Sequence, residues 1–340
     1  MSVDQRYFDD GRVLRPTWRA YALHLGLLLA TFCTATIAGV LFPFGPIVTL
    51  PGQETDPQTA SQWIDFLFSL PTRYVVLIGG AIEKMAADPV YLTYGLKFSL
   101  SLIFILFCHE MGHYIACRIY KVDATLPFFI PTPPLVGPAG TFGAFIKIMS
   151  PLPSRKAIFD IGVAGPIAGF FALIPIAIAE ISTMQTISPQ QAAVLAGNLT
   201  FSDPLLLKMI GAANGIDLSF GIGNPFYFAA WVGLLVTALN LIPSGQLDGG
   251  HALYAVLGER VHFWTGRIAF LAMATLSIIG WFVYGSPSGF LIAVLLGIMM
   301  RIKHPKPWDE TPLDGKRKLV AALVLVIFVL CFVPFPLKLS

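Results

Sequence analysis

The sequence predicts an all-α polytopic membrane protein with a small membrane-associated β element near residues 137–148. Of the 340 residues, 56% are hydrophobic and only 12% are charged, too few polar side chains to cover soluble cores. The apolar residues gather in runs long enough to cross a hydrocarbon layer about 30 Å thick, which takes about 20 residues of helix. One apolar stretch between two such runs is broken by prolines and glycines, and it holds the strand-like piece.

Six apolar runs are long enough to span a membrane, and a seventh, 288–300, is ambiguous by length. The basic stretch 301–318 reaches the same side as the other basic clusters only if 288–300 also crosses. We therefore expect seven spans, with six as the alternative. The six longer runs are 21–42, 92–118, 158–181, 225–243, 267–284 and 319–336.

The basic residues indicate the orientation of these spans. Arg12, Arg15 and Arg19 precede the first run, and Arg118 and Lys121 follow the second. Because basic residues favour the cytoplasmic side, we expect a cytoplasmic N-terminus. The first 20 residues lack the apolar core of a signal peptide, so we expect the first run to be a retained span.

The two loops expected outside, 43–91 and 182–224, carry few basic residues. The apolar piece "YVVLIGGAI" in the first loop is too short to span, so we expect it to rest at the outer interface. The net charge of +3 is small, and the basic residues lie beside apolar runs. This pattern is typical of topology determinants, and no nucleic-acid partner is expected.

The segment 126–156, between the second and third spans, is apolar but cannot be helical. Its piece "GTFGAFIKI" (140–148) has a strand-like composition. Non-helical apolar backbone near a membrane is tolerated where protein buries it or water reaches it. The pattern favours a re-entrant hairpin beside a cavity over the alternative, an ordinary cytoplasmic linker.

The second span contains "HEMGH", three ionisable residues where an apolar helix should have none. Because residues i and i+4 share a helix face, His109 and His113 can present two imidazoles to one zinc ion. Glu110 can then act as a general base toward water. An unpaired charge in a membrane costs on the order of 3 kcal/mol, which favours a shared function over histidines that only hydrogen-bond within the bundle.

A third ligand is needed, and the strongest candidate is Asp248 in "NLIPSGQLDGGH". Pro243 should end the fourth span, which runs in the same direction as the second and brings Asp248 to the same depth. The alternative is an aspartate in a turn or helix cap, and Glu180 and His251 are lesser candidates for the third ligand. Asn240 is either a donor to a developing oxyanion or a polar contact between helices.

The "HEMGH" and "NLIPSGQLDGGH" motifs together resemble the site-2 protease family of intramembrane zinc metalloproteases. The resemblance covers residues 95–258 and includes "GPAGTFGAFIKI" and the small-residue element "AGPIAG", for which we expect close helix packing. It implies that His109, His113 and Asp248 are the ligands of one zinc ion per chain. It also implies that Glu110 is the catalytic base and that Asn240 lies near the substrate carbonyl.

The resemblance implies hydrolysis of a peptide bond within or near the transmembrane segment of a single-span membrane protein. The nucleophile would be water on the zinc, activated by Glu110, and the 140–148 piece would pair with an unwound substrate by strand addition. The loops here are too short for the PDZ domain or CBS pair of many members. Some members of the similar subgroup are plastid proteins, but the short acidic N-terminus favours a bacterial inner membrane, with the active site toward the cytoplasm.

Two other functions use the same residues. A metal transporter or sensor would hold zinc in transit, and a pseudoprotease would bind single-span partners without cutting them. The presence of Glu110 favours the enzyme. We expect three regions: 1–91 with the first span and outer loop, 92–258 as the protease core, and 259–340 with the C-terminal helices.

Overall fold

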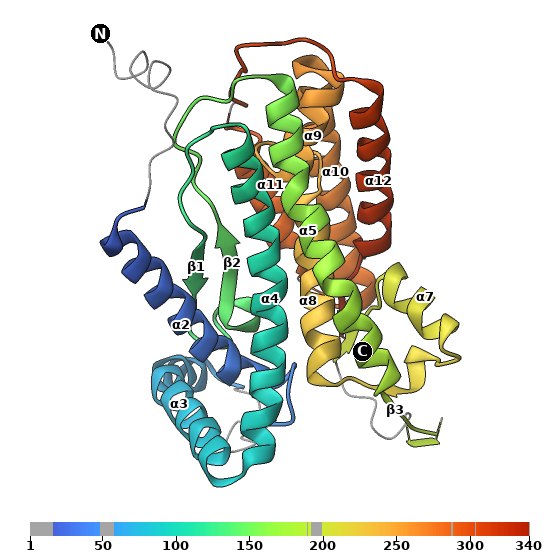
Figure 1. The fold of residues 1–340 in the computed structure, drawn as a ribbon. Helices are drawn as coiled ribbons and strands as arrows, with labels where there is room; N and C mark the ends of the chain where they lie inside the picture. The colour runs from blue at the N-terminus through green and yellow to red at the C-terminus, as the bar shows by residue number, and fades with distance from the viewer. Residues whose placement is uncertain are drawn as a thin grey trace.

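The computed structural model describes residues 16–47, 58–188, 190–191, 199–286, 288–302 and 304–339. Long helices stand side by side as a bundle, with the strands β1 and β2 beside the middle of α4 and shorter strands at one end of the bundle (Figure 1). Each predicted span contains a helix. The helices are α2 (Trp18–Val40), α3 (Ala60–Ala87), α4 (Pro89–Ile119), α5 (Arg155–Ser182), α7 (Leu205–Ala213), α8 (Pro225–Asn240), α9 (Asp248–Leu257), α10 (Glu259–Tyr284), α11 (Ser288–Met299) and α12 (Gly315–Cys331).

The count of seven spans is not confirmed. Among the described residues, five helices are long and apolar enough to cross a membrane: α2, α3, α4, α5 and α10. Helices α8 and α11 are apolar but shorter, and the 12 residues of α11 extend only about 18 Å. The chain nevertheless returns after α11 to the end of the bundle where α5 begins. A hydrogen bond of 2.9 Å from the Arg155 amide to the Asp309 carbonyl shows this return.

Polar caps fix where the central helices begin. Asp88 accepts a hydrogen bond from the Val90 amide at 2.9 Å, and Pro89 opens α4. Ser154 caps α5, and Asn224 caps α8. Each cap satisfies amides that the helix itself leaves unpaired, so each helix starts at a defined residue.

Helices α4, α5 and α8 form the centre of the fold. They pack against one another, with α4 and α8 running in one direction and α5 in the other (Figure 1). We call the end where α4 finishes and α5 starts the basic end, because Arg118, Lys121, Arg155 and Lys156 lie there. The parallel course of α4 and α8 matches the direction expected from the charges. Arg12 and Arg15 lie outside the described residues.

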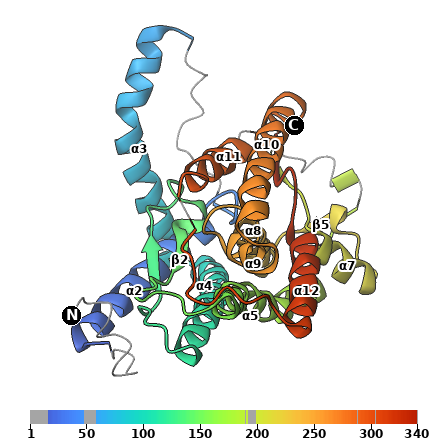
Figure 2. The same cartoon turned by 90° about the horizontal axis from the view of Figure 1, so that it is seen from above.

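Helix α3 is longer than the short apolar piece expected at this place. It packs through Leu77, Ala81 and Met85 across the end of the bundle opposite the basic end, and Figure 2 shows it projecting away from the other helices. Its polar and apolar side chains lie on different faces, the pattern of an amphipathic helix. The polar face holds Gln62, Asp65, Ser69 and Glu83, and the exposed apolar face holds Ile64, Leu67, Phe68 and Val75.

The predicted β element is a hairpin of β1 (Phe128–Pro131) and β2 (Thr141–Phe145), which pair antiparallel with Phe129 opposite Ala144. Its first strand lies before the expected boundary at residue 137. Helix α2 holds the hairpin, because His24 Nδ1 donates to the Pro127 carbonyl at 2.9 Å and Thr34 Oγ1 donates to the Gly140 carbonyl at 2.7 Å. No other described strand pairs with the second edge of β2.

The expectation of a single β element was incomplete. Two more two-stranded sheets lie at the end opposite the basic end, within the 182–224 loop and at the C-terminal segment. Strands of two or three residues carry too little alternation to be recognised in a sequence. They are β3 (Gln185–Thr186) with β5 (Gly221–Ile222), and β4 (Leu199–Phe201) with β6 (Leu337–Leu339).

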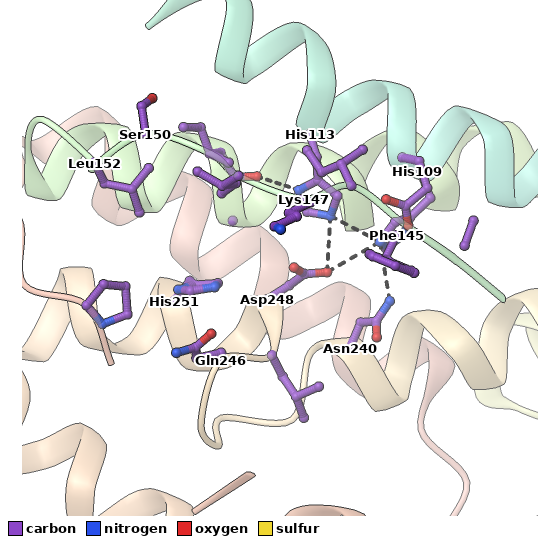
Figure 3. A pocket seen from close by; sticks show the side chains of 18 of the residues that line it. His109, His113, Phe145, Lys147, Ser150, Leu152, Asn240, Gln246, Asp248 and His251 are labelled. Carbon is purple, nitrogen blue, oxygen red and sulfur yellow. Dashed lines mark hydrogen bonds and ion pairs between the residues drawn. The ribbon is translucent and has the colours of Figure 1, made fainter. Parts of the chain in front are cut away.

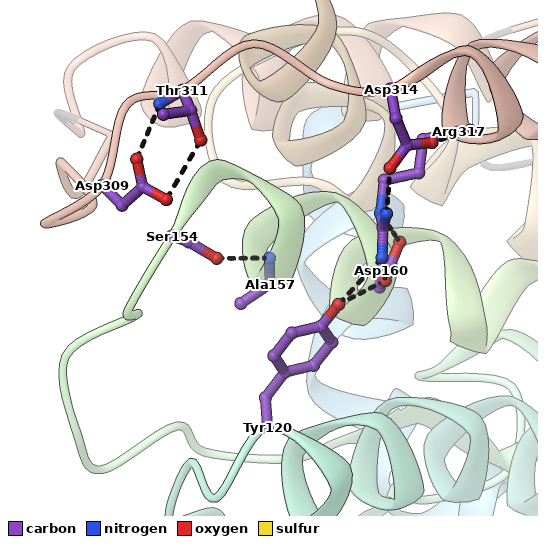
Figure 4. A network of polar contacts seen from close by, with 8 residues as sticks. All are labelled: Tyr120, Ser154, Ala157, Asp160, Asp309, Thr311, Asp314 and Arg317. Atoms are coloured by element: carbon purple, nitrogen blue, oxygen red, sulfur yellow. Dashed lines mark hydrogen bonds and ion pairs between the residues drawn. The ribbon is translucent and has the colours of Figure 1, made fainter.

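An ion-pair network connects three helices at the basic end (Figure 4). The Arg317 guanidinium donates to both oxygens of Asp160, at 2.9 and 2.6 Å, and pairs with Asp314. The Tyr120 hydroxyl donates to Asp160 and accepts from Arg317 at 3.1 Å. The network therefore ties the start of α12 to the end of α4 and the start of α5.

Candidate metal centre

Helix α4 places His109 and His113 on one buried face, one turn apart, with exposed fractions of 3% and 7%. Their Nε2 atoms lie 3.2 Å apart, and the rings meet edge to face. The i, i+4 spacing therefore places both imidazoles at one point, as the sequence predicted.

Asp248 reaches this point from α9. Helix α8 ends at Asn240, a short turn follows, and Asp248 is the first residue of α9. The turn folds back so tightly that a Cβ on Gly249 would lie 2.0 Å from the Leu241 carbonyl oxygen, so only glycine fits there. Asp248 Oδ2 lies 3.3 Å from the Nε2 atoms of His109 and His113.

The three side chains fit a zinc ion. Their ligand atoms all lie within 4.8 Å of one another, and the three closest separations are 3.2, 3.3 and 3.3 Å. Ligand atoms about 2.0–2.1 Å from zinc at tetrahedral angles are separated by about 3.3–3.4 Å. Two imidazoles and one carboxylate also leave one tetrahedral position open, as in catalytic sites.

Helix α5 fixes the orientation of the His113 ring through a hydrogen bond to Nδ1, the nitrogen that faces away from the cluster. The His113 Nδ1 donates to the Ile161 carbonyl at 2.7 Å, so in the neutral ring Nε2 carries no hydrogen and presents a lone pair to the cluster. A Cβ on Gly165 would lie 2.1 Å from His113 Nε2. The close packing expected for "AGPIAG" is thus confirmed, and it brings α5 directly against the metal-facing ring.

Glu110 and Asn240 complete the group. Glu110 is 5% exposed and lines the same cavity as the histidines. The Asn240 Nδ2 lies 3.3 Å from His109 Nε2, so its amide points at the place where the three ligand atoms converge. All five residues singled out in the sequence therefore line one cavity, and Figure 3 shows His109, His113, Asn240 and Asp248 pointing toward one another.

A cavity of about 630 Å³ opens onto this cluster. One wall is α4, a second is the backbone from Ala144 to Leu152 that continues β2, and a third is the α8–α9 turn and α9 (Figure 3). The proline- and glycine-broken segment thus lines the cavity, as the hairpin interpretation expected. Sequence reasoning missed several lining residues, because polar or proline residues in loops give no periodic signal: Lys147, Ser150, Gln246 and Pro305.

The two lesser candidates for the third ligand do not join the cluster. Glu180 is fully buried near the end of α5 that lies opposite the basic end, and it does not line the cavity. His251 does line the cavity, but its Nδ1 is hydrogen-bonded to His304 at 2.7 Å. Among the described residues, the three-member group that could hold a metal is His109, His113 and Asp248.

Comparison with known proteins agrees with this geometry. The family model "Peptidase family M50", the site-2 protease family, matches residues 97–280, more than half of the chain. The chain belongs to peptidase family M50. Because M50 proteins are membrane-embedded, and because several helices here are long and apolar enough to span, this M50 chain is a multi-pass membrane protein.

Plant proteins named as probable chloroplastic zinc metalloproteases are similar to this M50 chain. It is 32% identical to EGY1 of Oryza sativa subsp. japonica over 67% of its own length and 38% of the relative. It is 30% identical to EGY1 of Arabidopsis thaliana over 68% of its length and 41% of the relative. EGY2 of Arabidopsis thaliana is 26% identical over 85% of this chain and 52% of the relative. The chain thus spans about two fifths to one half of these relatives.

Proposed function

We propose that this M50 chain is an intramembrane zinc metalloprotease that cuts a peptide bond within or near the membrane span of a single-span protein. The observation that carries the proposal is the convergence of His109, His113 and Asp248 at tetrahedral spacings, beside Glu110, inside a cavity bounded by apolar helices. The M50 match and the zinc metalloprotease names of the relatives support it.

The residues have distinct roles in this reaction. His109, His113 and Asp248 would hold zinc, which supplies a Lewis acid at the open position. Glu110 takes a proton from the attacking water and later delivers it to the leaving amine. Asn240 donates a hydrogen bond to the carbonyl oxygen as negative charge develops on it.

The hairpin gives the substrate a place to bind. A helical peptide bond is shielded by its own turns, so the substrate must unwind before the attack. The second edge of β2 is unpaired among the described strands, and the backbone that continues β2 lines the cavity. An unwound segment can add to this edge as a strand, and main-chain hydrogen bonds then hold the scissile bond across the metal centre.

A metal transporter or sensor fits the structure less well. A transport path needs several successive ligand groups, and the described residues contain a single three-member group. A pseudoprotease would not need the buried carboxylate of Glu110 beside the ligands. The cavity of about 630 Å³ that holds the histidines is also lined by the backbone that continues β2, which suits a bound peptide segment.

The charges support an orientation in the membrane. We propose that the N-terminus and the basic end lie on the cytoplasmic side, or on the equivalent stromal side of a plastid membrane. The names of the relatives place those proteins in chloroplasts, which does not fit the bacterial inner membrane expected from the sequence.

The test uses Glu110→Gln, which keeps the size of the side chain and removes the base. Purified wild-type protein and the variant are reconstituted with a single-span test protein whose apolar helix is interrupted by Asn and Pro. We expect cleavage by the wild type only, with equal zinc content in both proteins. Cleavage by Glu110→Gln at the wild-type rate would remove Glu110 from the mechanism, and metal flux without cleavage would favour the transporter.

A further inference from the structure

The cavity wall opposite β2 carries a histidine that the proposed reaction leaves without a role. His251 lies one turn after Asp248 on α9 and lines the cavity. Figure 3 shows His251 near Gln246 and Asp248, and Phe145 and Lys147 of the β2 wall line the same cavity. His251 is therefore placed to meet whatever binds between α9 and the β2 wall.

Two hydrogen bonds fix which nitrogen of His251 carries its hydrogen. His304 Nδ1 lies 2.8 Å from the Pro305 carbonyl oxygen, which can only accept, so this Nδ1 is the donor. His304 Nε2 must then accept from His251 Nδ1, 2.7 Å away. In a neutral His251 ring the remaining nitrogen, Nε2, is then a lone-pair acceptor, and the hydrogen bonds of the described residues include none to it.

The hydrogen bonds require a neutral His304 ring, and burial keeps both rings neutral at neutral pH. Burial and the neighbouring ring lower the pKa of His304 to about 3. Burial likewise lowers the pKa of His251 to about 4.

The segment that carries His304 is held in place. We call residues 304–309 the strap. The His304 ring stacks on Tyr254 with a centroid distance of 4.0 Å and an interplanar angle of 11°. At the other end of the strap, the Asp309 amide donates to the Pro153 carbonyl at 3.1 Å. The strap therefore positions His304 as a fixed acceptor, which sets the tautomer of His251.

A bound strand would need such an acceptor. If one edge of the substrate pairs with β2, the N–H and C=O groups of its other edge point toward α9. In surroundings poor in water, a polar backbone group without a partner costs free energy comparable to a lost hydrogen bond. Nε2 of His251 is an acceptor on that wall with no described partner.

We propose that His251 Nε2 accepts a hydrogen bond from one backbone N–H of the substrate strand, on the edge turned away from β2, and that His304 holds His251 in the required tautomer. The inference rests on the proposed function. Side chains three residues apart on a helix have Cβ atoms about 5–6 Å apart. An extended strand rises about 3.3 Å per residue, so the N–H belongs to a residue one or two positions from the scissile bond.

This contact predicts a substrate preference. Proline has no backbone N–H, so proline at that one position of the substrate should be disfavoured. Proline at neighbouring positions whose N–H groups face β2 would be disfavoured for a different reason, the loss of strand pairing. A proline scan of the substrate therefore separates the His251 contact from the β2 contact.

The experiment measures binding in the Glu110→Gln background, where bound substrate is not consumed. The probe is a dye-labelled single-span test protein in lipid nanodiscs, with proline placed singly around its cleavage site. Adding His251→Phe should weaken binding about fivefold or more, because a substrate N–H loses its acceptor. His251→Gln retains an acceptor oxygen and should bind much more tightly than His251→Phe. His304→Phe should weaken binding and His304→Gln should not.

The proline scan distinguishes a direct contact of His251 with the substrate from a purely structural role of His251. Proline at one position of the test protein should weaken its binding to Glu110→Gln. The same proline should cause no further loss of affinity for the double variant that carries Glu110→Gln and His251→Phe. Zinc content and melting temperature should be the same in both proteins. Equal affinity of the two for every probe would overturn the role of His251 and leave the protease proposal standing. Failure of Glu110→Gln to bind any probe would overturn both, and loss of zinc in His251→Phe would show that His251 acts on the metal instead.

Discussion

Gly165→Ala should damage the metal centre without changing any ligand. A Cβ at this position would lie 2.1 Å from His113 Nε2, whereas ordinary contact begins at 3.4 Å, so the ring or α5 must move by more than 1 Å. Ligand distances at zinc tolerate only about 0.2 Å, and overpacking of this kind costs about 1–3 kcal/mol. Because about 1.4 kcal/mol is a factor of ten, zinc affinity should fall by roughly 5- to 150-fold.

The matched control is Gly79→Ala on α3, a helical glycine with open space around its Cβ position. Zinc affinity is measured by competition with a chromogenic chelator, on protein purified in detergent, alongside the melting temperature. We expect Gly79→Ala to match the wild type in both. Wild-type zinc affinity in Gly165→Ala would refute the claim that α5 lies directly against the metal-facing ring.

Three further changes test other parts of the structure. Arg317→Ala removes the contacts to Asp160 and should lower the free energy of unfolding by about 1–3 kcal/mol; an unchanged melting temperature would contradict this. The folded pKa of His304 is depressed to about 3, so the unfolded chain binds more protons below about pH 6.5. The contribution of His304 to the free energy of unfolding is complete above that pH and is lost as the pH falls, by at most about 2 kcal/mol at pH 5. His304→Gln should reduce this loss of stability, which thermal unfolding measures. Finally, Asp65 and Glu83 are each replaced by a single cysteine. Because an amphipathic α3 lies in the membrane–water interface, both cysteines should react with an impermeant maleimide from the same side of sealed vesicles. Reaction from opposite sides would show that α3 spans the membrane.

The residues of the candidate metal centre could be singled out in the sequence because they conflict with their surroundings. His109, Glu110 and His113 stand in an apolar run where ionisable residues are costly, and Asp248 follows a span that runs in the same direction. The depth and direction of the two spans were enough to predict that Asp248 lies near the histidines. The structure places its carboxylate 3.3 Å from both.

Other features could not be read from the sequence, for identifiable reasons. His304 stands in a polar loop, where a histidine is neither costly nor periodic, so its contact with His251 is a product of tertiary structure. At the place of helix α3 the sequence predicts only a short interfacial piece, because Pro71 and the polar residues of the other helix face interrupt the apolar run. The contact of Gly165 with His113 depends on how closely two helices approach, which composition indicates only in general terms.

The zinc content of the purified protein tests the central claim most directly, that two distant segments of the chain form one zinc site. Elemental analysis of the wild type should give one zinc per chain. Asp248→Asn and His109→Ala should each lose most of the metal while still folding, and Glu110→Gln should retain it. Full zinc occupancy in both Asp248→Asn and His109→Ala would contradict the assignment of these residues as ligands.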